Sequence, residues 1–214
     1  MLNTKKILLV FIPAILLVSA TLFIRIVQYE PLFPDIAEKP EKKTGEFVIP
    51  IFPLDPIIGN KKAPTTIVAF EDFACPACVE QSAMLDVLLQ KYPDSIKIIW
   101  KGLPVSEFPY SSLKAHTYGF CAHAQDKFEP FRKLALANSD NLSDSILGSI
   151  AESIELKIDK LSECLESRET LAYIDTVEQI ALILNIQAVP TFFMDNKQIV
   201  TPKTEFEWET ILKL

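Results

Sequence analysis

Two cysteines separated by two residues, in Cys75-Pro76-Ala77-Cys78, are the side chains in this sequence best suited to chemistry by type and spacing. An apolar β-rich run precedes them and a helical pattern follows, which predicts that Cys75 lies at a helix N-terminus. Unpaired backbone N–H groups and the helix dipole stabilise a thiolate there. Two intervening residues bring both sulfurs to one side of the first turn, so they can close a disulfide. The segment therefore predicts a reversible thiol–disulfide pair.

The two residues between the cysteines are expected to support the thiolate. Pro76 at the first helical position loses no hydrogen bond, because the N–H there has no helical partner. Pro76 and Ala77 together form the loop that holds the thiolate. In such motifs the pKa of the nucleophilic thiol falls from about 8.5 to between ~3.5 and ~7.5.

A zinc site is the main alternative for a lone C-x-x-C motif. Zinc would require a second ligand pair, whereas Cys121 and Cys164 are isolated. His116, Cys121 and His123 form an H-x4-C-x-H run, but residues 121 and 123 of a helix point about 200° apart. They cannot converge on one ion, so we predict neither a metal nor a cofactor. Both histidines are interpreted as ordinary surface or partly packed residues.

The elements around the motif alternate between strand and helix. Residues 65–70, TTIVAF, form an apolar run typical of a strand buried on both faces. The helix that starts at the motif extends to about Lys91, and residues 96–100 are typical of a second strand. This order predicts two parallel strands joined by a right-handed crossover.

Downstream, the pattern becomes helical and then returns to strands. The expected helices of the middle of the chain are 111–124, 127–137, 143–153, about 159–165 and 167–184. Residues 191–194 and 198–201 are predicted to form a hairpin. A final helix is expected to open at Thr204, which begins a capping-box pattern.

The start of the chain carries a long apolar run. Residues 7–24 contain no charge and are flanked by Lys5, Lys6 and Arg25. As a helix this run would be about 27 Å long, close to the roughly 30 Å thickness of a membrane's hydrocarbon core. A core helix of this composition would need protein on every side. Residues 1–29 are therefore predicted to be a membrane signal-anchor with one transmembrane helix.

A cleaved signal peptide is the alternative for this segment. Val18-Ser19-Ala20 has the small-residue spacing that a signal peptidase accepts. Cleavage near Ala20 would leave the apolar residues 21–24 exposed at the start of a secreted or periplasmic protein. The retained anchor is favoured for this reason, and because the apolar run is long for a signal peptide.

The distribution of charged side chains along the sequence predicts that most of the chain lies outside the cytoplasm. Residues 1–29 contain three basic and no acidic side chains, and the remainder contains 18 basic and 28 acidic ones. Basic residues beside a membrane span stay in the cytoplasm, so the catalytic domain is expected on the periplasmic or extracellular side of the cytoplasmic membrane. An acidic domain without basic clusters argues against nucleic acid as a partner.

Composition divides the rest of the chain in two. Seven of the 15 prolines lie in residues 30–64, which favours an extended tether, and residues 47–50 near its end could form an edge strand. Residues 65–214 are expected to form a globular domain. With 23% charged residues, 4 Cys and 5 Gly, the chain is neither a disordered polyelectrolyte, a disulfide-dense miniprotein nor collagen-like.

Two motifs of the predicted domain follow each other along the chain in the order that is typical of a known protein family. The run GNKKAPTTIVAFEDFACPAC from Gly59 to Cys78 is followed far downstream by VPTFF at residues 189–193. From about Asp55 to the C-terminus, the chain resembles an exported DsbA-like thiol-disulfide oxidoreductase of the thioredoxin superfamily. The resemblance implies an α/β thioredoxin-like fold with a helical insertion, at about 105–185, between the second and third core strands.

The resemblance also implies roles for four further residues. Val189-Pro190 would form a cis peptide bond facing the Cys75 sulfur, which leaves the Val189 backbone free to pair with an extended substrate. A strand-edge proline is the alternative. Cys121 and Cys164 would form a second, structural disulfide that stabilises the fold by roughly 4 kcal/mol on the chain-entropy model. Two buried free thiols are the alternative for this pair.

One departure from the family pattern concerns a buried acid. Relatives often place one six residues before the first cysteine, where this chain has Ala69. Glu71 and Asp72 are near, but strand alternation does not ensure that either reaches Cys78, and both could be solvated turn residues. The middle pair Pro76-Ala77 also lacks a histidine, so a milder redox potential is expected.

The function implied by the resemblance is the introduction of disulfides into reduced or misoxidised exported polypeptides by Cys75 and Cys78. A membrane redox partner would reoxidise the pair. The same motifs would also suit a reductase or an isomerase. A metal-binding domain and a non-catalytic thioredoxin-like binding module are further alternatives.

Overall fold

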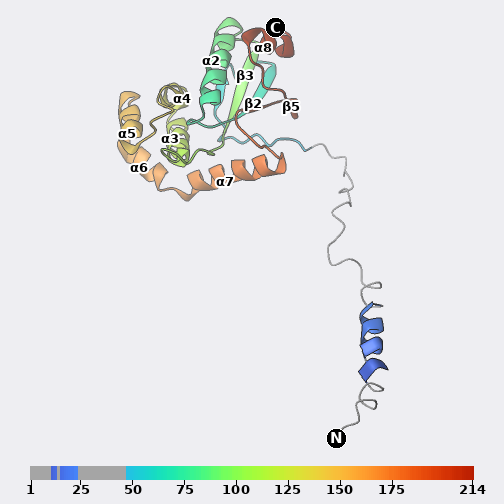
Figure 1. Ribbon diagram of the computed structural model, residues 1–214. Helices are drawn as coiled ribbons and strands as arrows, with labels where there is room; N and C mark the ends of the chain where they lie inside the picture. Colours follow the sequence, from blue (N-terminus) through green and yellow to red (C-terminus); the bar gives the residue numbers. More distant parts are fainter. Residues whose placement is uncertain (1–10, 14, 24–46) are drawn as a thin grey trace. The chain divides into compact units, whose positions relative to one another are not determined.

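The computed structural model describes residues 11–13, 15–23 and 47–214 (Figure 1). The chain divides into two units at Glu46. Residues 11–13 and 15–23 are helical, and no helix among the described residues is both long and apolar enough to cross a membrane. The rest of the predicted anchor, and residues 30–46 of the predicted tether, lie outside the described residues.

A five-stranded mixed sheet lies at the centre of the second unit (Figure 1). Its strands are β1 (Ile57–Gly59), β2 (Thr65–Glu71), β3 (Ile96–Gly102), β4 (Thr191–Met194) and β5 (Lys197–Ile199). They lie in the order β1-β3-β2-β4-β5; β2 and β3 are parallel, and the other neighbours are antiparallel. The predicted strand–helix–strand unit and the predicted hairpin are therefore confirmed.

The helices follow the predicted order. They are α2 (Pro76–Lys91), α3 (Ser112–His123), α4 (Phe128–Ala137), α5 (Asp144–Ser153), α6 (Ile158–Leu165), α7 (Arg168–Ile183) and α8 (Glu205–Leu212). The helices α3 to α7 lie between β3 and β4 in the sequence, which confirms the helical insertion of a thioredoxin-like fold.

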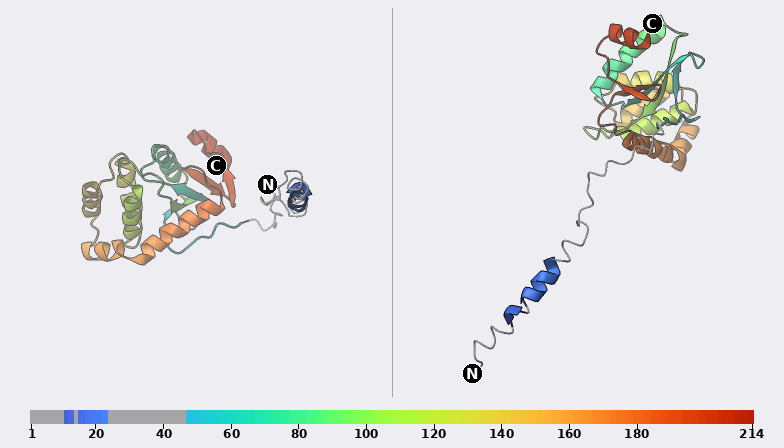
Figure 2. Two further views of the ribbon diagram at one scale, coloured as in Figure 1. Left: turned by 60° about the horizontal axis from the view of Figure 1, so that its bottom comes forward. Right: turned by 90° about the vertical axis from the view of Figure 1, so that its right-hand side faces the viewer.

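Side-chain alternation along β2 divides the core between the two faces of the sheet. On one face, Ala69 packs in a cluster with Leu85 of α2 and Trp208 of α8. On the other face, Phe70 packs with Val177 of α7. Figures 1 and 2 show α7 running across one face and α2 and α8 covering the other, with α3 to α6 gathered at one end of the sheet. Both faces of β2 are buried, as its apolar run predicted.

The sheet begins earlier in the chain than expected. The strand β1 lies within residues 30–64, which composition favoured as a tether, whereas residues 47–50 form no strand. Because β1 is three residues long and follows Pro56, it carries no alternation that periodicity could detect. The N–H of Ile49 instead donates to the side-chain oxygen of Asn196 at 2.9 Å. The folded unit therefore includes the end of the segment expected to be a tether.

A buried ionic network holds the residues that precede β1. The Asp55 carboxylate accepts hydrogen bonds from Lys101 Nζ and from the Tyr173 hydroxyl, each at 2.6 Å. Lys101 Nζ also donates to the carbonyl of Pro50 at 2.9 Å. Burial lowers the pKa of Lys101 and raises that of Tyr173. A charge this deeply buried is tolerated only when paired, so the network fastens residues 50–55 to β3 and α7.

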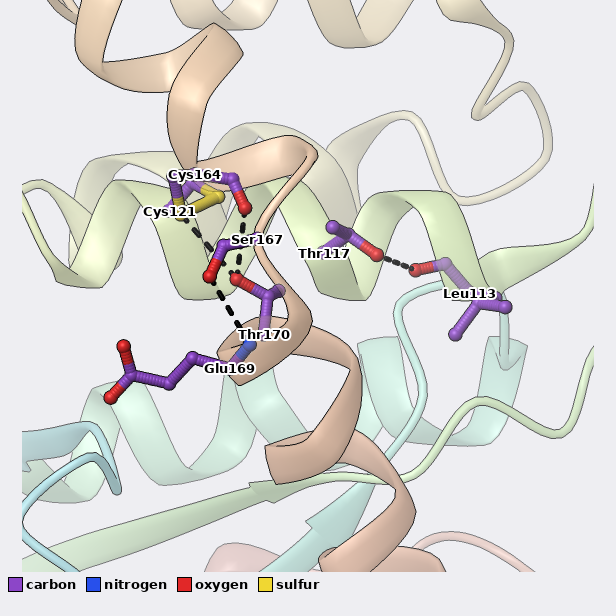
Figure 3. Close-up of a disulfide and its surroundings, with 7 residues drawn as sticks. All are labelled: Leu113, Thr117, Cys121, Cys164, Ser167, Glu169 and Thr170. Atoms are coloured by element: carbon purple, nitrogen blue, oxygen red, sulfur yellow. Dashed lines mark hydrogen bonds between the residues drawn. A yellow bond between two sulfur atoms is a disulfide. The ribbon is translucent and has the colours of Figure 1, made fainter.

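Cys121 of α3 and Cys164 of α6 form a disulfide, with 5.7 Å between their Cα atoms (Figure 3). The Thr170 hydroxyl lies beside it and donates to the carbonyl of Cys164 at 3.0 Å. Ser167 caps α7 by accepting a hydrogen bond from the N–H of Glu169. The disulfide therefore joins two helices of the insertion next to the start of the helix that crosses the sheet.

Removal of this disulfide is expected to lower the free energy of unfolding by roughly 4 kcal/mol, because the bridge closes a loop with a sequence separation of 43. Denaturant unfolding of a Cys121→Ala/Cys164→Ala variant measures the loss, in a Cys75→Ser/Cys78→Ala background that allows only this bridge. Chemical reduction of the background protein should reproduce the loss and should leave the variant unchanged. A difference below about 1 kcal/mol would contradict the expectation.

Candidate active site

Cys75 caps the N-terminus of α2, as the sequence predicts. Its backbone is extended, with φ −91° and ψ 117°, and Pro76 follows as the first helical residue. The N–H of Cys78 donates to the Cys75 sulfur at 3.3 Å. The same N–H also donates to the Cys75 carbonyl at 3.0 Å, so the amide at the start of the helix is shared between the backbone and the sulfur.

The two cysteines, both free thiols, differ in accessibility. Cys75 is partly exposed, whereas the side chain of Cys78 is completely buried. The Cys78 sulfur accepts a hydrogen bond from the N–H of Asp72 at 3.5 Å. A large substrate can therefore reach the sulfur of Cys75 but not that of Cys78.

The Val189-Pro190 peptide lies against this accessible sulfur. The bond is cis, and the Cys75 thiol donates to the carbonyl of Val189 at 3.6 Å across 114 positions of sequence. The fold thus brings Val189 and Pro190, immediately before β4, next to the first turn of α2. An extended substrate chain bound along this peptide would place its own sulfur near Cys75.

The environments of the two thiols move their pKa values in opposite directions. A hydrogen bond from the Cys78 thiol lowers the pKa of Cys75 to about 7, helped by the backbone N–H groups of Cys78 and Ala77 and opposed by burial. The same thiol–thiol hydrogen bond, together with burial, raises the pKa of Cys78. These shifts favour the thiolate at the partly exposed Cys75 and the protonated thiol at the buried Cys78 near neutral pH.

Alkylation of Cys75 in the reduced protein is expected to rise with pH around a midpoint of about 7, because the thiolate reacts and the thiol does not. Iodoacetamide labelling followed by mass spectrometry, from pH 5 to 10, measures the profile. The control is Cys78→Ala, which removes the thiol hydrogen bond and should move the midpoint upward. A parent midpoint above about 8.5, the value of an ordinary cysteine, would refute this electrostatic account.

The Asp72 carboxylate organises the loops around the motif. Its donors are the N–H groups of Ala74, Val105 and Ser106, the Ser112 hydroxyl and His116 Nε2, at 2.8 to 3.1 Å. Burial by itself would raise the pKa of Asp72, but the hydrogen bond and charge of His116 and the N–H donors hold it well below its usual range. Asp72 thus ties the loop after β3 to the turn that carries Cys75.

Three polar residues near the motif are more deeply buried than the sequence indicated. Glu71 and Asp72 are 3% and 0% exposed, so neither is a solvated turn residue. His116 is 2% exposed and bonded to Asp72, so its interpretation as a surface or partly packed residue is wrong. His123 is half-buried, as expected. Burial of these side chains depends on α3 and on the loop after β3, which no local pattern in the sequence indicates.

Glu71 is the functional candidate that alternation could have found. The predicted strand ends at Phe70, whereas β2 continues to Glu71, which therefore faces the same side of the sheet as Ala69. Burial raises the pKa of Glu71 to about 7, against the opposing positive charge of Arg132. A strand prediction one residue longer would have placed this acid in the core behind Cys78.

A family model described as thioredoxin matches residues 53–214. Disulfide bond formation protein D of Bacillus subtilis is 26% identical over 160 residues, which cover 67% of this chain and 69% of that protein. The thiol-disulfide exchange protein alpha-DsbA2 of Wolbachia pipientis superposes with a TM-score of 0.67 and 19% identity, over 74% of this chain and 86% of that chain. This superposition agrees with the fold described above.

A second kind of relative is much longer than this chain. The Na(+)/H(+) antiporter NhaA 3 of Salinispora tropica is 29% identical over 155 residues, which cover 72% of this chain. The match covers 24% of that protein, so the chain spans about a quarter of the length of this relative.

Proposed function

From the premise that the chain belongs to the thioredoxin family and is a thiol-disulfide oxidoreductase of the DsbA type, we propose that it introduces disulfides into exported polypeptides. The observation that carries the proposal is the contact between Cys75 and the cis Val189-Pro190 peptide. A partly exposed sulfur of lowered pKa lies there beside backbone that an extended chain can use. The similarity to a disulfide bond formation protein supports the same assignment.

In the proposed reaction the Cys75–Cys78 pair begins as a disulfide. A substrate thiolate attacks the exposed Cys75 sulfur, the bond between the two cysteines breaks, and Cys78 leaves. A second substrate thiolate then attacks the substrate sulfur of this mixed disulfide, and Cys75 leaves as a thiolate. Two electrons pass from the substrate to the pair, and the lowered pKa of Cys75 favours its departure.

The direct test uses the oxidised full-length chain and a reduced, unfolded protein that contains cysteines. One substrate disulfide is expected to form for each Cys75–Cys78 disulfide consumed, as counted by mass spectrometry after quenching in acid. Oxidised protein that leaves the substrate reduced would overturn the proposal and favour a non-catalytic binding module. Metal analysis of the purified chain tests the metal-binding alternative in the same preparation.

The direction of electron flow depends on the reduction potential of the pair. Equilibration with glutathione buffers measures it, and an oxidase is expected to lie well above the about −270 mV of a cytosolic thioredoxin. A value near −270 mV would favour a reductase acting on the same substrates. The Pro76-Ala77 pair lacks a histidine, which supports a reduction potential milder than that of the strongest oxidants of the family.

We propose further that residues 1–29 anchor the domain on the outer side of the cytoplasmic membrane, near a membrane partner that reoxidises Cys75 and Cys78. The apolar run of residues 7–24 and the basic residues around it support this location. Tethering would raise the effective concentration of the domain near such a partner. Protease accessibility of the domain in spheroplasts tests its side of the membrane, and extraction with alkaline carbonate distinguishes an anchor from a cleaved signal.

A further inference from the structure

A buried amide on α2 joins this helix to the C-terminal part of the chain. Gln81 lies three residues after Cys78 on the buried face of α2, and it is 7% exposed. Its Nε2 atom donates to the carbonyl of Pro202 at 2.7 Å, across 121 positions of sequence. Its Oε1 atom accepts a hydrogen bond from the indole N–H of Trp208 at 3.0 Å, across 127 positions. One side chain of α2 therefore holds two distant segments.

The two partners of Gln81 require an amide at this position. The carbonyl of Pro202 accepts hydrogen bonds but cannot donate, and the indole of Trp208 donates but cannot accept. The NH2 group of Gln81 must therefore face Pro202, and its oxygen must face Trp208. Trp208 is completely buried, so an unpaired indole N–H would be costly. A hydrocarbon side chain of the same length would leave both partners unpaired.

One of these partners packs on the strand that follows the cis peptide. The indole ring of Trp208 lies edge-on against the ring of Phe192 in β4, with 5.0 Å between the ring centroids. Phe192 is two residues after Pro190 and is completely buried. The hydrogen bond between Gln81 and Trp208 therefore holds α2 against the start of β4.

The other partner leads to the cis peptide itself. Pro202 is buried and follows Thr201, whose hydroxyl donates to the carbonyl of Pro190 at 3.5 Å. At the first turn of α2, the Cys75 thiol contacts the carbonyl of Val189 at 3.6 Å. The contacts thus run from α2 through this loop to the cis peptide and back to α2. The position of Cys75 relative to the cis peptide therefore depends on both ends of this circuit.

A second link between α2 and α8, which lie side by side in Figure 1, is at the surface. Lys91 Nζ and the Tyr92 hydroxyl, at the end of α2, donate to the Glu209 carboxylate at 2.5 and 3.0 Å. The side chain of Lys91 is 55% exposed, and exposed ion pairs of this kind add little to stability. Among the described residues, the bond between Gln81 and Trp208 is thus the buried hydrogen bond that joins the two helices.

The position of Cys75 relative to the cis peptide matters more for a polypeptide than for a small molecule. An extended polypeptide must place its sulfur at Cys75 while its backbone pairs with Val189, so two contacts must fit together. A small disulfide needs only the Cys75 sulfur. A misplacement of about 1 Å between reacting groups that are held in place can slow a reaction by about 100-fold. A shift of α2 relative to β4 should therefore slow exchange with polypeptides selectively.

We propose that Gln81 is a positioning residue that makes the site select extended polypeptides over small disulfides. It holds the Cys75 sulfur in register with the Val189-Pro190 peptide, and it acts through Pro202 and Trp208 rather than by touching the substrate. This role presupposes the proposed thiol–disulfide exchange at Cys75.

The test compares two reagents that release the same coloured thiolate. One is dithiobis-nitrobenzoate, and the other is an extended peptide whose single cysteine is joined to nitrothiobenzoate by a disulfide. The Cys75 thiolate attacks a sulfur of the reagent, a new S–S bond forms, the S–S bond of the reagent breaks, and nitrothiobenzoate leaves with the electron pair. The full-length chain carries Cys78→Ala, so that each reaction stops at the mixed disulfide.

Gln81→Met removes both hydrogen bonds and keeps the length of the side chain. It should slow the reaction with the peptide about 10-fold and the reaction with dithiobis-nitrobenzoate less than about 2-fold. The second reaction corrects for any change in the thiolate fraction of Cys75. Glu209→Gln weakens the surface link between the same two helices. It is the matched control and should change neither rate.

Gln81→Glu separates the hydrogen bonds from packing alone. A protonated carboxyl can donate to Pro202 and accept from Trp208, whereas a carboxylate cannot donate. Burial favours the protonated form of such a carboxyl. The ratio of the peptide rate to the dithiobis-nitrobenzoate rate should therefore match the parent at pH 6 and fall as the pH rises and the carboxyl ionises. The ratio in Gln81→Met should stay low throughout.

A second peptide, N-methylated on both sides of its cysteine, separates this role from the proposed function. It cannot pair with the Val189 backbone, so the parent should react with it more slowly than with the unmodified peptide. Equal parent rates for the two peptides would overturn substrate binding along the cis peptide and count against the proposed function.

Three results would overturn the role of Gln81 alone, in a parent that prefers the unmodified peptide. The first is an unchanged preference in Gln81→Met. The second is an equal slowing with both reagents, because that indicates a structural effect on the whole site. The third is a ratio in Gln81→Glu that is as low as in Gln81→Met at every pH. A selective loss in Gln81→Met that Gln81→Glu restores at pH 6 supports the role.

Discussion

A Cys75→Ser variant is expected to lose thiol–disulfide exchange completely, down to the rate measured without protein. Cys75 is the partly exposed thiol of the pair, its pKa is lowered to about 7, and its sulfur contacts the Val189 carbonyl. A serine hydroxyl is not ionised near neutral pH and cannot form a disulfide, so no mixed disulfide can arise. Oxidation of a reduced, unfolded protein by stoichiometric full-length chain measures the effect.

Cys78→Ala is the matched control for this loss. It keeps the nucleophile but removes the buried thiol that resolves the intermediate, so a mixed disulfide between Cys75 and a disulfide-containing peptide should accumulate. Mass spectrometry of the quenched reaction detects this species. Exchange by Cys75→Ser at more than a tenth of the parent rate, or a mixed disulfide formed through Cys78, would show that the roles are assigned wrongly.

Replacement of Asp55 by alanine is expected to cost about 3 to 5 kcal/mol of unfolding free energy, although Asp55 lies outside the active site. The change leaves the Lys101 ammonium buried without its counterion and removes the acceptor of the Tyr173 hydroxyl. It also frees residues 50–55 from β3 and α7. Denaturant unfolding of the full-length chain, monitored by far-ultraviolet circular dichroism, measures the loss.

An exposed ion pair provides the comparison for this effect. Asp144, 78% exposed, pairs with Lys114 at 2.6 Å, and Asp144→Ala should cost at most about 1 kcal/mol. A double variant, Asp55→Asn/Lys101→Met, keeps an acceptor for Tyr173 and removes the buried charge, so it should be more stable than Asp55→Ala. Equal stabilities of Asp55→Ala and Asp144→Ala would mean that the buried network does not hold the fold.

Much of the fold follows from local patterns in the sequence. The parallel strands β2 and β3, the helix α2 between them and the helices of the insertion end within a few residues of their predicted bounds. Alternation, helical periodicity and proline placement act over a few neighbouring residues, so a single sequence displays them. The short strand β1 lacks such a signal and lies within the segment expected to be a tether.

The sequence by itself determined which two cysteines form the candidate redox pair. Cys75 and Cys78 lie at the start of a helix with two residues between them, and helix geometry alone brings their sulfurs to the same side of the first turn. The DsbA-like resemblance of the surrounding motifs is confirmed by the family match and the fold. Spacing alone left open which cysteine would be shielded and what would face the other.

Only the tertiary structure decided how the pair is controlled. It places Val189 against Cys75 across 114 residues, and it buries Glu71, Asp72 and His116 behind the motif. In a solvated turn, the carboxyl groups of Glu71 and Asp72 would titrate near their ordinary values. Burial and pairing are created by packing between distant elements, and they change the free energy of a charge far more than neighbours in sequence do.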